Sequence, residues 1–144
     1  MDILPDDRAM LSRRMAEIAD ENQAELILTT GGTGFSPRDV MPEATEDITE
    51  RKVPGIPEAI RAYSMTITKR AMLSRATAGI RKKTLIINLP GSPKAVKEKS
   101  LFGYRPYRLL LRPGYCFWRY EAGWGQHPSL KRPLWYVRKA EWCS

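Results

Sequence analysis

Two stretches of the chain combine glycine with hydroxyl side chains in a way that suits phosphate binding, and a carboxylate follows the first of them. The first is Thr29-Thr30-Gly31-Gly32-Thr33-Gly34, which follows the apolar run Leu26-Ile27-Leu28 and precedes Arg38-Asp39. Glycines let successive backbone N–H groups face one point, and a helix N-terminus adds partial positive charge. The spacing matches neither a P-loop nor a dinucleotide-binding loop, so a plain strand-to-helix connection is the alternative. Asp39 fits either a ligand-binding carboxylate or a helix cap.

The second stretch follows another apolar run, from Thr84 to Asn88, and reads Leu89-Pro90-Gly91-Ser92-Pro93. Ser92 is suited to cap a helix that Pro93 opens. Strands that alternate with helices predict an α/β fold of three layers, with a mostly parallel sheet and helices on both faces. Ligands gather at the carboxyl ends of such strands, so the two glycine-bearing turns are expected to share a pocket.

Apolar residues at helical spacing predict the elements that hold these turns. The residues expected to face inward are Leu11, Met15 and Ile18 in a first helix, Val40, Ala44 and Ile48 in a second, and Ile60, Tyr63 and Ile67 in a third that Pro57 opens. Either Asp6 or Asp7 would cap the first helix. Residues 72–76 fit a strand or a loop, and residues 81–83 are expected to form a solvated basic turn.

Composition sets limits on the class of protein. A chain of 144 residues with 42% hydrophobic residues fits one packed domain. No apolar run approaches the ~18 residues of a membrane span, and acidic residues stand where a signal peptide would be basic, so we expect a cytoplasmic protein. One histidine and two cysteines without ligand spacing argue against a His/Cys metal site. The net charge of +8 divides into +2 for residues 1–100 and +6 for residues 101–144.

The ordered set of motifs resembles the signature of the molybdopterin adenylyltransferase family, which includes the G domain of gephyrin. The matching segments are Thr29-Thr30-Gly31-Gly32-Thr33-Gly34, Arg38-Asp39-Val40, Pro42-Glu43-Ala44-Thr45, Val53-Pro54-Gly55, Leu73-Ser74-Arg75, Ala78-Gly79-Ile80-Arg81 and Thr84 to Lys94. The resemblance covers about residues 3–100. It implies transfer of AMP from ATP to molybdopterin with release of pyrophosphate, assisted by Mg²⁺. The glycine turn is similar in the molybdate-insertion enzymes, but the segment from Arg38 to Thr45 favours the adenylyl-transfer branch.

The resemblance also implies roles for single residues. Asp39 and Asp6 are the catalytic carboxylates, and Asp39 is the Mg²⁺ ligand; Asp6 has helix capping as its alternative role. Molybdopterin or phosphate would be bound by Thr30, Gly31, Gly32, Thr33, Gly34, Ser74, Asn88, Pro90, Gly91 and Ser92. The family further implies a homotrimer and a molybdate-insertion enzyme as a partner. A molybdopterin-binding or scaffold domain without activity is the alternative function.

Both ends depart from the family pattern. Residues 1–100 are expected to form a partial molybdopterin-binding domain, because the family's preceding strand, with its Ser-Asp pair, is missing. Residues 101–144 hold all four tryptophans and 11 of the 13 aromatic residues, without a sustained helical period. We interpret them as an atypical, poorly ordered tail produced by a frameshift or a fusion near codon 100. A tail that binds single-stranded nucleic acid by stacking is the less favoured alternative.

Overall fold

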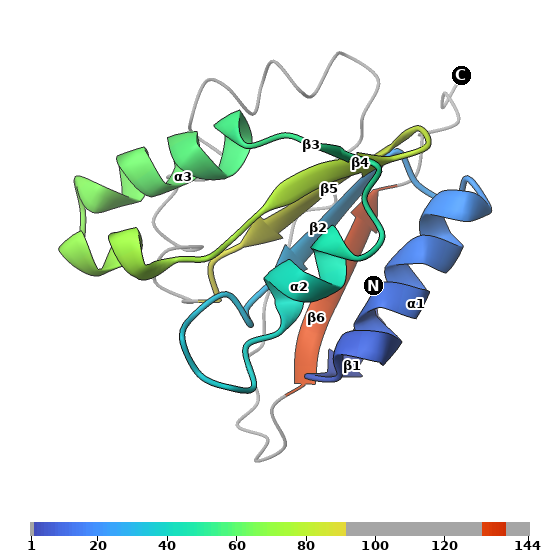
Figure 1. The fold of residues 1–144 in the computed structure, drawn as a ribbon, viewed down its shortest axis with the longest axis horizontal. Helices are drawn as coiled ribbons and strands as arrows, with labels where there is room; N and C mark the ends of the chain where they lie inside the picture. The colour runs from blue at the N-terminus through green and yellow to red at the C-terminus, as the bar shows by residue number, and fades with distance from the viewer. Residues whose placement is uncertain (1, 92–130, 138–144) are drawn as a thin grey trace, which may run out of the picture.

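The structure is a computed structural model that describes residues 2–91 and 131–137 (Figure 1). Its elements in chain order are β1 (Asp2–Pro5), α1 (Arg8–Asp20), β2 (Leu26–Thr30), α2 (Met41–Glu46), β3 (Arg51–Lys52), α3 (Gly55–Met65), the 3₁₀ helix η1 (Lys69–Leu73), β4 (Ala78–Arg81), β5 (Thr84–Leu89) and β6 (Lys131–Val137). No helix among these is long and apolar enough to cross a membrane.

Six strands form one sheet in the order β1-β6-β2-β5-β4-β3. Among the strands of the described residues, only β2 and β5 pair in parallel, and the other four pairings are antiparallel. The α/β class is therefore confirmed, whereas the mostly parallel sheet is corrected to a mixed one. The physical reason is that β4 joins β5 through a short hairpin, and two residues between strands permit only antiparallel pairing.

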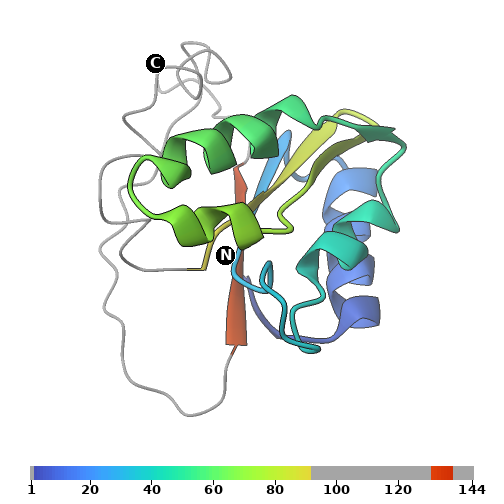
Figure 2. The ribbon, with the colours of Figure 1, turned by 60° about the vertical axis from the view of Figure 1, so that its left-hand side comes forward.

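Helices cover both faces of the sheet, as the three-layer prediction requires (Figure 2). Neighbouring residues of β2 point to opposite faces, so Ile27 packs under α1 and α2 while Leu28 packs under α3. The first core contains Leu11, Met15, Ile18, Ala24, Ile27, Met41, Ala44, Ile48 and Ile86. The second contains Leu28, Ile60, Ala78, Ile87 and Leu89. The inward-facing residues predicted for the first two helices are confirmed, with Val40 partly buried beside the first core.

The third helix departs from its predicted pattern. Ile60 is buried, but 37% of Tyr63 and 51% of Ile67 remain exposed. The C-terminal end of α3 projects past the ends of the strands, next to η1 (Figure 1). The helix ends at Met65, so Ile67 lies beyond it. The ambiguous segment 72–76 lies partly in η1 and then runs extended toward β4.

Arg81 is not part of a solvated turn, because it is the last residue of β4 and pairs with Asp20 at the end of α1. Its guanidinium donates to both carboxylate oxygens, at 2.8 and 2.7 Å, and to the carbonyl of Ile48 at 3.0 Å. These bonds hold the pKa of Asp20 down at about 2, with the neighbouring Lys82 adding to the shift. The ion pair between Arg81 and Asp20 thus connects α1 to the β4–β5 hairpin, at the edge of the sheet away from the glycine turns.

Four of the described strands, β1, β3, β4 and β6, were not predicted. β1 precedes α1, and β6 comes from the segment interpreted as a tail and lies between β1 and β2, antiparallel to both. One edge of β1 and one edge of β2 are therefore paired by β6. Residues 92–130 and 138–144, which include Ser92 and the rest of the predicted tail, lie outside the described residues.

Candidate functional site

The two glycine-bearing turns meet at the carboxyl ends of β2 and β5. The parallel register pairs Thr30 with Leu89, so both strands end at the same level. Beyond that point the Gly31 N–H donates to the Leu89 carbonyl at 3.1 Å, and the Thr30 hydroxyl donates to the Pro90 carbonyl at 3.1 Å. The convergence predicted from the alternation of strands and helices is present in the structure.

The first turn requires glycine at two positions. Gly31 and Gly32 have φ values of 87° and 65°, which side chains rarely adopt. A Cβ on Gly32 would also lie 3.2 Å from the Cβ of Met41, because the Met41 N–H donates to the Gly32 carbonyl at 3.2 Å. The backbone of this turn is therefore pressed directly against the first residue of α2.

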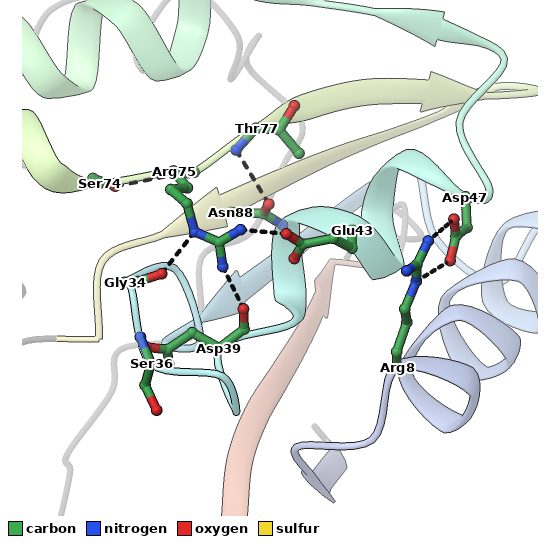
Figure 3. Close-up of polar contacts among 11 residues, drawn as sticks. Arg8, Gly34, Ser36, Asp39, Glu43, Asp47, Ser74, Arg75, Thr77 and Asn88 are labelled. Atoms are coloured by element: carbon green, nitrogen blue, oxygen red, sulfur yellow. Dashed lines mark hydrogen bonds and ion pairs between the residues drawn. The ribbon is translucent and has the colours of Figure 1, made fainter.

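Two carboxylates flank the glycine turn. Asp6 Oδ1 lies 3.8 Å from the position that a Cβ on Gly32 would take, and Asp39 Oδ2 lies 2.9 Å from the same position on Gly34. Asp39 also accepts a hydrogen bond from the Ser36 N–H at 3.1 Å, which closes the loop on itself (Figure 3). Asp7 is the helix cap, since its side chain accepts from the Met10 N–H at 2.7 Å. The capping alternative for Asp6 is therefore not the arrangement found.

A third segment, between η1 and β4, contacts the same turn. The Arg75 N–H donates to the Thr33 carbonyl at 2.9 Å, which places the neighbouring Ser74 beside the glycines. Arg61 of α3 supports this segment through the carbonyls of Ser74 and Ala76, at 3.1 and 3.0 Å. The side chain of Arg75 reaches across the loop to the carbonyl of Gly34, the carbonyl of Asp39 and the carboxylate of Glu43 (Figure 3).

Glu43 is ionised at neutral pH. Burial acts to raise its pKa, but the backbone N–H at the start of α2 and the Arg75 guanidinium together outweigh burial, so the pKa lies below its usual value. Neither Arg75 nor Glu43 was assigned a role from the sequence, although both stand in the motifs of the resemblance. Nothing in the spacing pairs two residues separated by 32 positions, so only the fold identifies them.

Unlike Asp6, Asp39 and Ser74, which are only partly buried, Asn88 is buried. Its side chain is fully buried, with an exposed fraction of 0%. Its amide donates to the hydroxyls of Thr29 at 3.0 Å and Thr45 at 2.8 Å, and its carbonyl oxygen accepts from the Thr77 N–H at 3.2 Å. The side chain thus joins β2, β5, α2 and the start of β4 beneath the turns. Pro90 is half-buried and Gly91 is exposed at the end of β5.

The donor chemistry of the site suits a hard cation. Within residues 2–91 and 131–137, no group of three or more acidic, histidine or cysteine side chains is placed to bind a metal. Mg²⁺ commonly uses only one or two protein carboxylates and completes its shell with water and phosphate oxygens. Asp6 and Asp39, on either side of a backbone turn suited to phosphate, fit that pattern.

Comparison with known proteins agrees with this geometry. A family described as "Probable molybdopterin binding domain" matches residues 1–102. The chain is 44% identical over 112 residues to a molybdopterin adenylyltransferase of Helicobacter pylori, a match that covers 76% of this chain and 64% of the relative. It is 45% identical over 96 residues to the molybdopterin adenylyltransferase of Escherichia coli K12, covering 67% of this chain and 49% of the relative. The chain therefore spans between half and two thirds of these relatives.

Solved structures agree in fold. The crystal structure of the molybdopterin biosynthesis enzyme MoaB from Thermus thermophilus superposes with a TM-score of 0.63 at 44% identity, covering 74% of this chain and 69% of that one. A molybdopterin biosynthesis protein from Mycobacterium abscessus gives a TM-score of 0.64 at 34% identity, covering 74% and 66%.

Proposed function

Because the chain belongs to the family of molybdopterin-binding domains, we propose that it acts in molybdenum-cofactor biosynthesis by transferring AMP from ATP to molybdopterin. In this reaction an oxygen of the molybdopterin phosphate attacks the α-phosphorus of ATP. The bond from that phosphorus to the bridging oxygen breaks, and pyrophosphate leaves. The chemistry asks the protein to hold two polyanions in line and to balance their charge.

The observation that carries the proposal is the pairing of two strand ends with two carboxylates. The turns after β2 and β5 are joined by the bonds from Gly31 to Leu89 and from Thr30 to Pro90. In the first turn, Asp6 lies beside Gly32 and Asp39 lies beside Gly34. A backbone turn of this kind is suited to phosphate, and carboxylates beside it are suited to the cation that accompanies ATP.

In this proposal phosphate binding, metal binding and support of the turns belong to different residues. Gly32, Thr33 and Gly34 hold a phosphate through backbone N–H and hydroxyl groups, with Ser74, Pro90 and Gly91 at the rim. Thr30 and Gly31, whose hydroxyl and N–H donate to Pro90 and Leu89, fix the shape of the turn. By the family resemblance Ser92, which lies outside the described residues, is a further phosphate ligand. Asp39 and Asp6 would hold Mg²⁺, which would neutralise phosphate charge when bound. Asn88 supports the turns from the core, since its amide is engaged by Thr29 and Thr45.

The test is a direct assay with molybdopterin, ATP and Mg²⁺. We expect adenylylated molybdopterin and pyrophosphate from the wild-type chain, and loss of roughly a hundredfold or more in kcat for Asp39→Asn. The asparagine keeps an oxygen that accepts from Ser36 N–H, so the loop is retained while the charge is lost. Asp47→Asn is the matched control, because Asp47 lies at the far end of α2 in an exposed ion pair with Arg8, and its activity should match the wild type.

A wild-type chain that binds molybdopterin with no product would instead support the alternative of a binding or scaffold domain without activity. Product formation that persists in Asp39→Asn would refute the assignment of that carboxylate.

The proposal extends to the protein's surroundings. By family resemblance we propose a homotrimer in the cytoplasm whose product passes to a molybdate-insertion enzyme. Light scattering on the purified chain tests the trimer: a mass of three chains supports it, and a mass of one chain contradicts it.

A further inference from the structure

Arg75 contacts the glycine turn at several points, and the sequence around it does not predict these contacts. Its Nε donates to the Gly34 carbonyl at 2.7 Å, and its two terminal nitrogens donate to the Asp39 carbonyl and to a carboxylate oxygen of Glu43. Its own backbone N–H donates to the Thr33 carbonyl. One residue therefore holds both the start and the end of the exposed part of the loop, and connects them to α2 (Figure 3).

The geometry of these contacts depends on a guanidinium. Its donors lie in one plane and point in fixed, diverging directions, whereas a lysine ammonium is a compact charge at the end of a flexible chain. Three acceptors from three different residues surround Arg75, namely Gly34, Asp39 and Glu43. A lysine has no means to meet all three in that plane, so replacement keeps the charge and loses the clamp.

The contacts bear on the position of a carboxylate that we assign to catalysis. Residues 35–38 are exposed, and between them and α2 the backbone of Asp39 is held by Arg75. If that carbonyl were released, the Asp39 side chain would lose its fixed relation to Gly34 and Ser36. Because Glu43 is ionised and belongs to α2, it gives the guanidinium a fixed anchor on the helix side.

We infer that Arg75, anchored by Glu43, is a positioning residue that holds the glycine turn and Asp39 in the arrangement that grips substrate phosphate. The inference rests on the proposed function for its consequence in catalysis. Arg75 acts through the loop, because each of its three donor nitrogens contacts a protein acceptor.

The experiment compares Arg75→Lys with Arg81→Lys. Arg81 is a matched control because it too is partly buried and bonds a carboxylate and a backbone carbonyl, but at the edge of the sheet away from the turns. Three quantities are measured at a temperature where unfolding curves show all variants folded: hydrogen exchange of the segments 31–41 and 78–89, the Kd values for ATP with Mg²⁺ and for molybdopterin, and the steady-state constants.

For Arg75→Lys we expect faster exchange in residues 31–41 and weaker binding of at least one substrate. We also expect kcat/KM to fall by roughly tenfold to a hundredfold, with a raised KM for the substrate whose binding weakens. A variant that only lowered the amount of folded protein would reduce the apparent kcat and leave KM unchanged. For Arg81→Lys we expect faster exchange in residues 78–89, with binding and kinetics within about twofold of the wild type.

The inference is overturned if Arg75→Lys exchanges, binds and reacts as the wild type does, or if the two variants change binding equally. Should the wild-type chain transfer no AMP, the proposed function fails, but the exchange and binding measurements still decide on Arg75. Faster exchange in residues 31–41 with weaker binding would then support its positioning role, and unchanged values would refute it.

Discussion

Replacing Asn88 with alanine is expected to destabilise the fold strongly. The side chain is fully buried and makes three hydrogen bonds, to Thr29, Thr45 and the backbone of Thr77. A buried hydrogen bond contributes about 1 kcal/mol net, and partners left without one in the core add to the loss. The missing amide also leaves a small cavity in a close-packed layer. We therefore expect Asn88→Ala to lower the free energy of unfolding by about 3–5 kcal/mol.

Chemical unfolding followed by circular dichroism measures this loss, and a double-mutant cycle apportions it. Thr45→Val removes one acceptor of the Asn88 amide while keeping a similar volume, so the double variant should lose less than the two single variants together. For the hydrogen bond between Asn88 and Thr45 we expect a coupling free energy of about 1 kcal/mol, within a factor of two.

Two results would refute this reasoning. A loss below about 1 kcal/mol in Asn88→Ala would mean that the buried amide contributes little to stability. Weakened binding of phosphate without a loss of stability would mean that Asn88 contacts the ligand, as the family resemblance implies. The structure favours stability as its main role, because the amide contacts lie beneath the turns.

Two further predictions concern other parts of the sheet. Gly79→Ala should cost about 1–3 kcal/mol in denaturant unfolding, because the added carbon would lie 2.6 Å from Thr49 Cγ2; Gly55→Ala, with nothing within 4 Å, should be neutral or slightly stabilising, and equal losses would contradict this. Asp20 has a pKa of about 2 in the folded state, against a usual 3.8, because of Arg81. The contribution of this ion pair to stability is full above pH 3.8 and is lost as the pH falls toward 2. Over that range the free energy of unfolding of the wild type should therefore fall more steeply with decreasing pH than that of Asp20→Asn. The difference in slope should correspond to at most about one bound proton. Parallel slopes would argue against the ion pair.

The parts of the fold that were predicted correctly depend on local patterns. Leu11, Met15 and Ile18 recur at helical spacing, and the structure buries all three. The meeting of the two turns also followed from sequence, because parallel neighbouring strands end at the same edge, and β2 and β5 are neighbours. Spacing and strand order within one segment carry enough physical information for such predictions.

The parts that were missed depend on contacts between distant segments. β1 has four residues with alternating exposure, too few to distinguish from the lead-in to a helix. Arg75 and Glu43 are brought together only when the segment after η1 passes over the glycine turn. The direction of β4 follows from a hairpin in which Lys82 adopts a φ of 50°. A lysine rarely adopts this conformation, so the residue type does not predict the turn.

The two carboxylates of the candidate site consequently depend on different parts of the chain. Asp39 is fixed by nearby segments, through Ser36 and through Arg75. Asp6 follows directly after β1, whose sheet partner is β6, with Pro5 paired to Lys131. β6 in turn joins the sheet through β2, where Leu134 pairs with Thr29 one residue before the end of that strand. Asp6 therefore lies between β1, which is paired with a strand from the distant end of the sequence, and α1, which Asp7 caps and which packs on α2. Changes that weaken β6 should affect the contribution of Asp6 first and leave the turn itself, which rests on the β2–β5 pairing, in place.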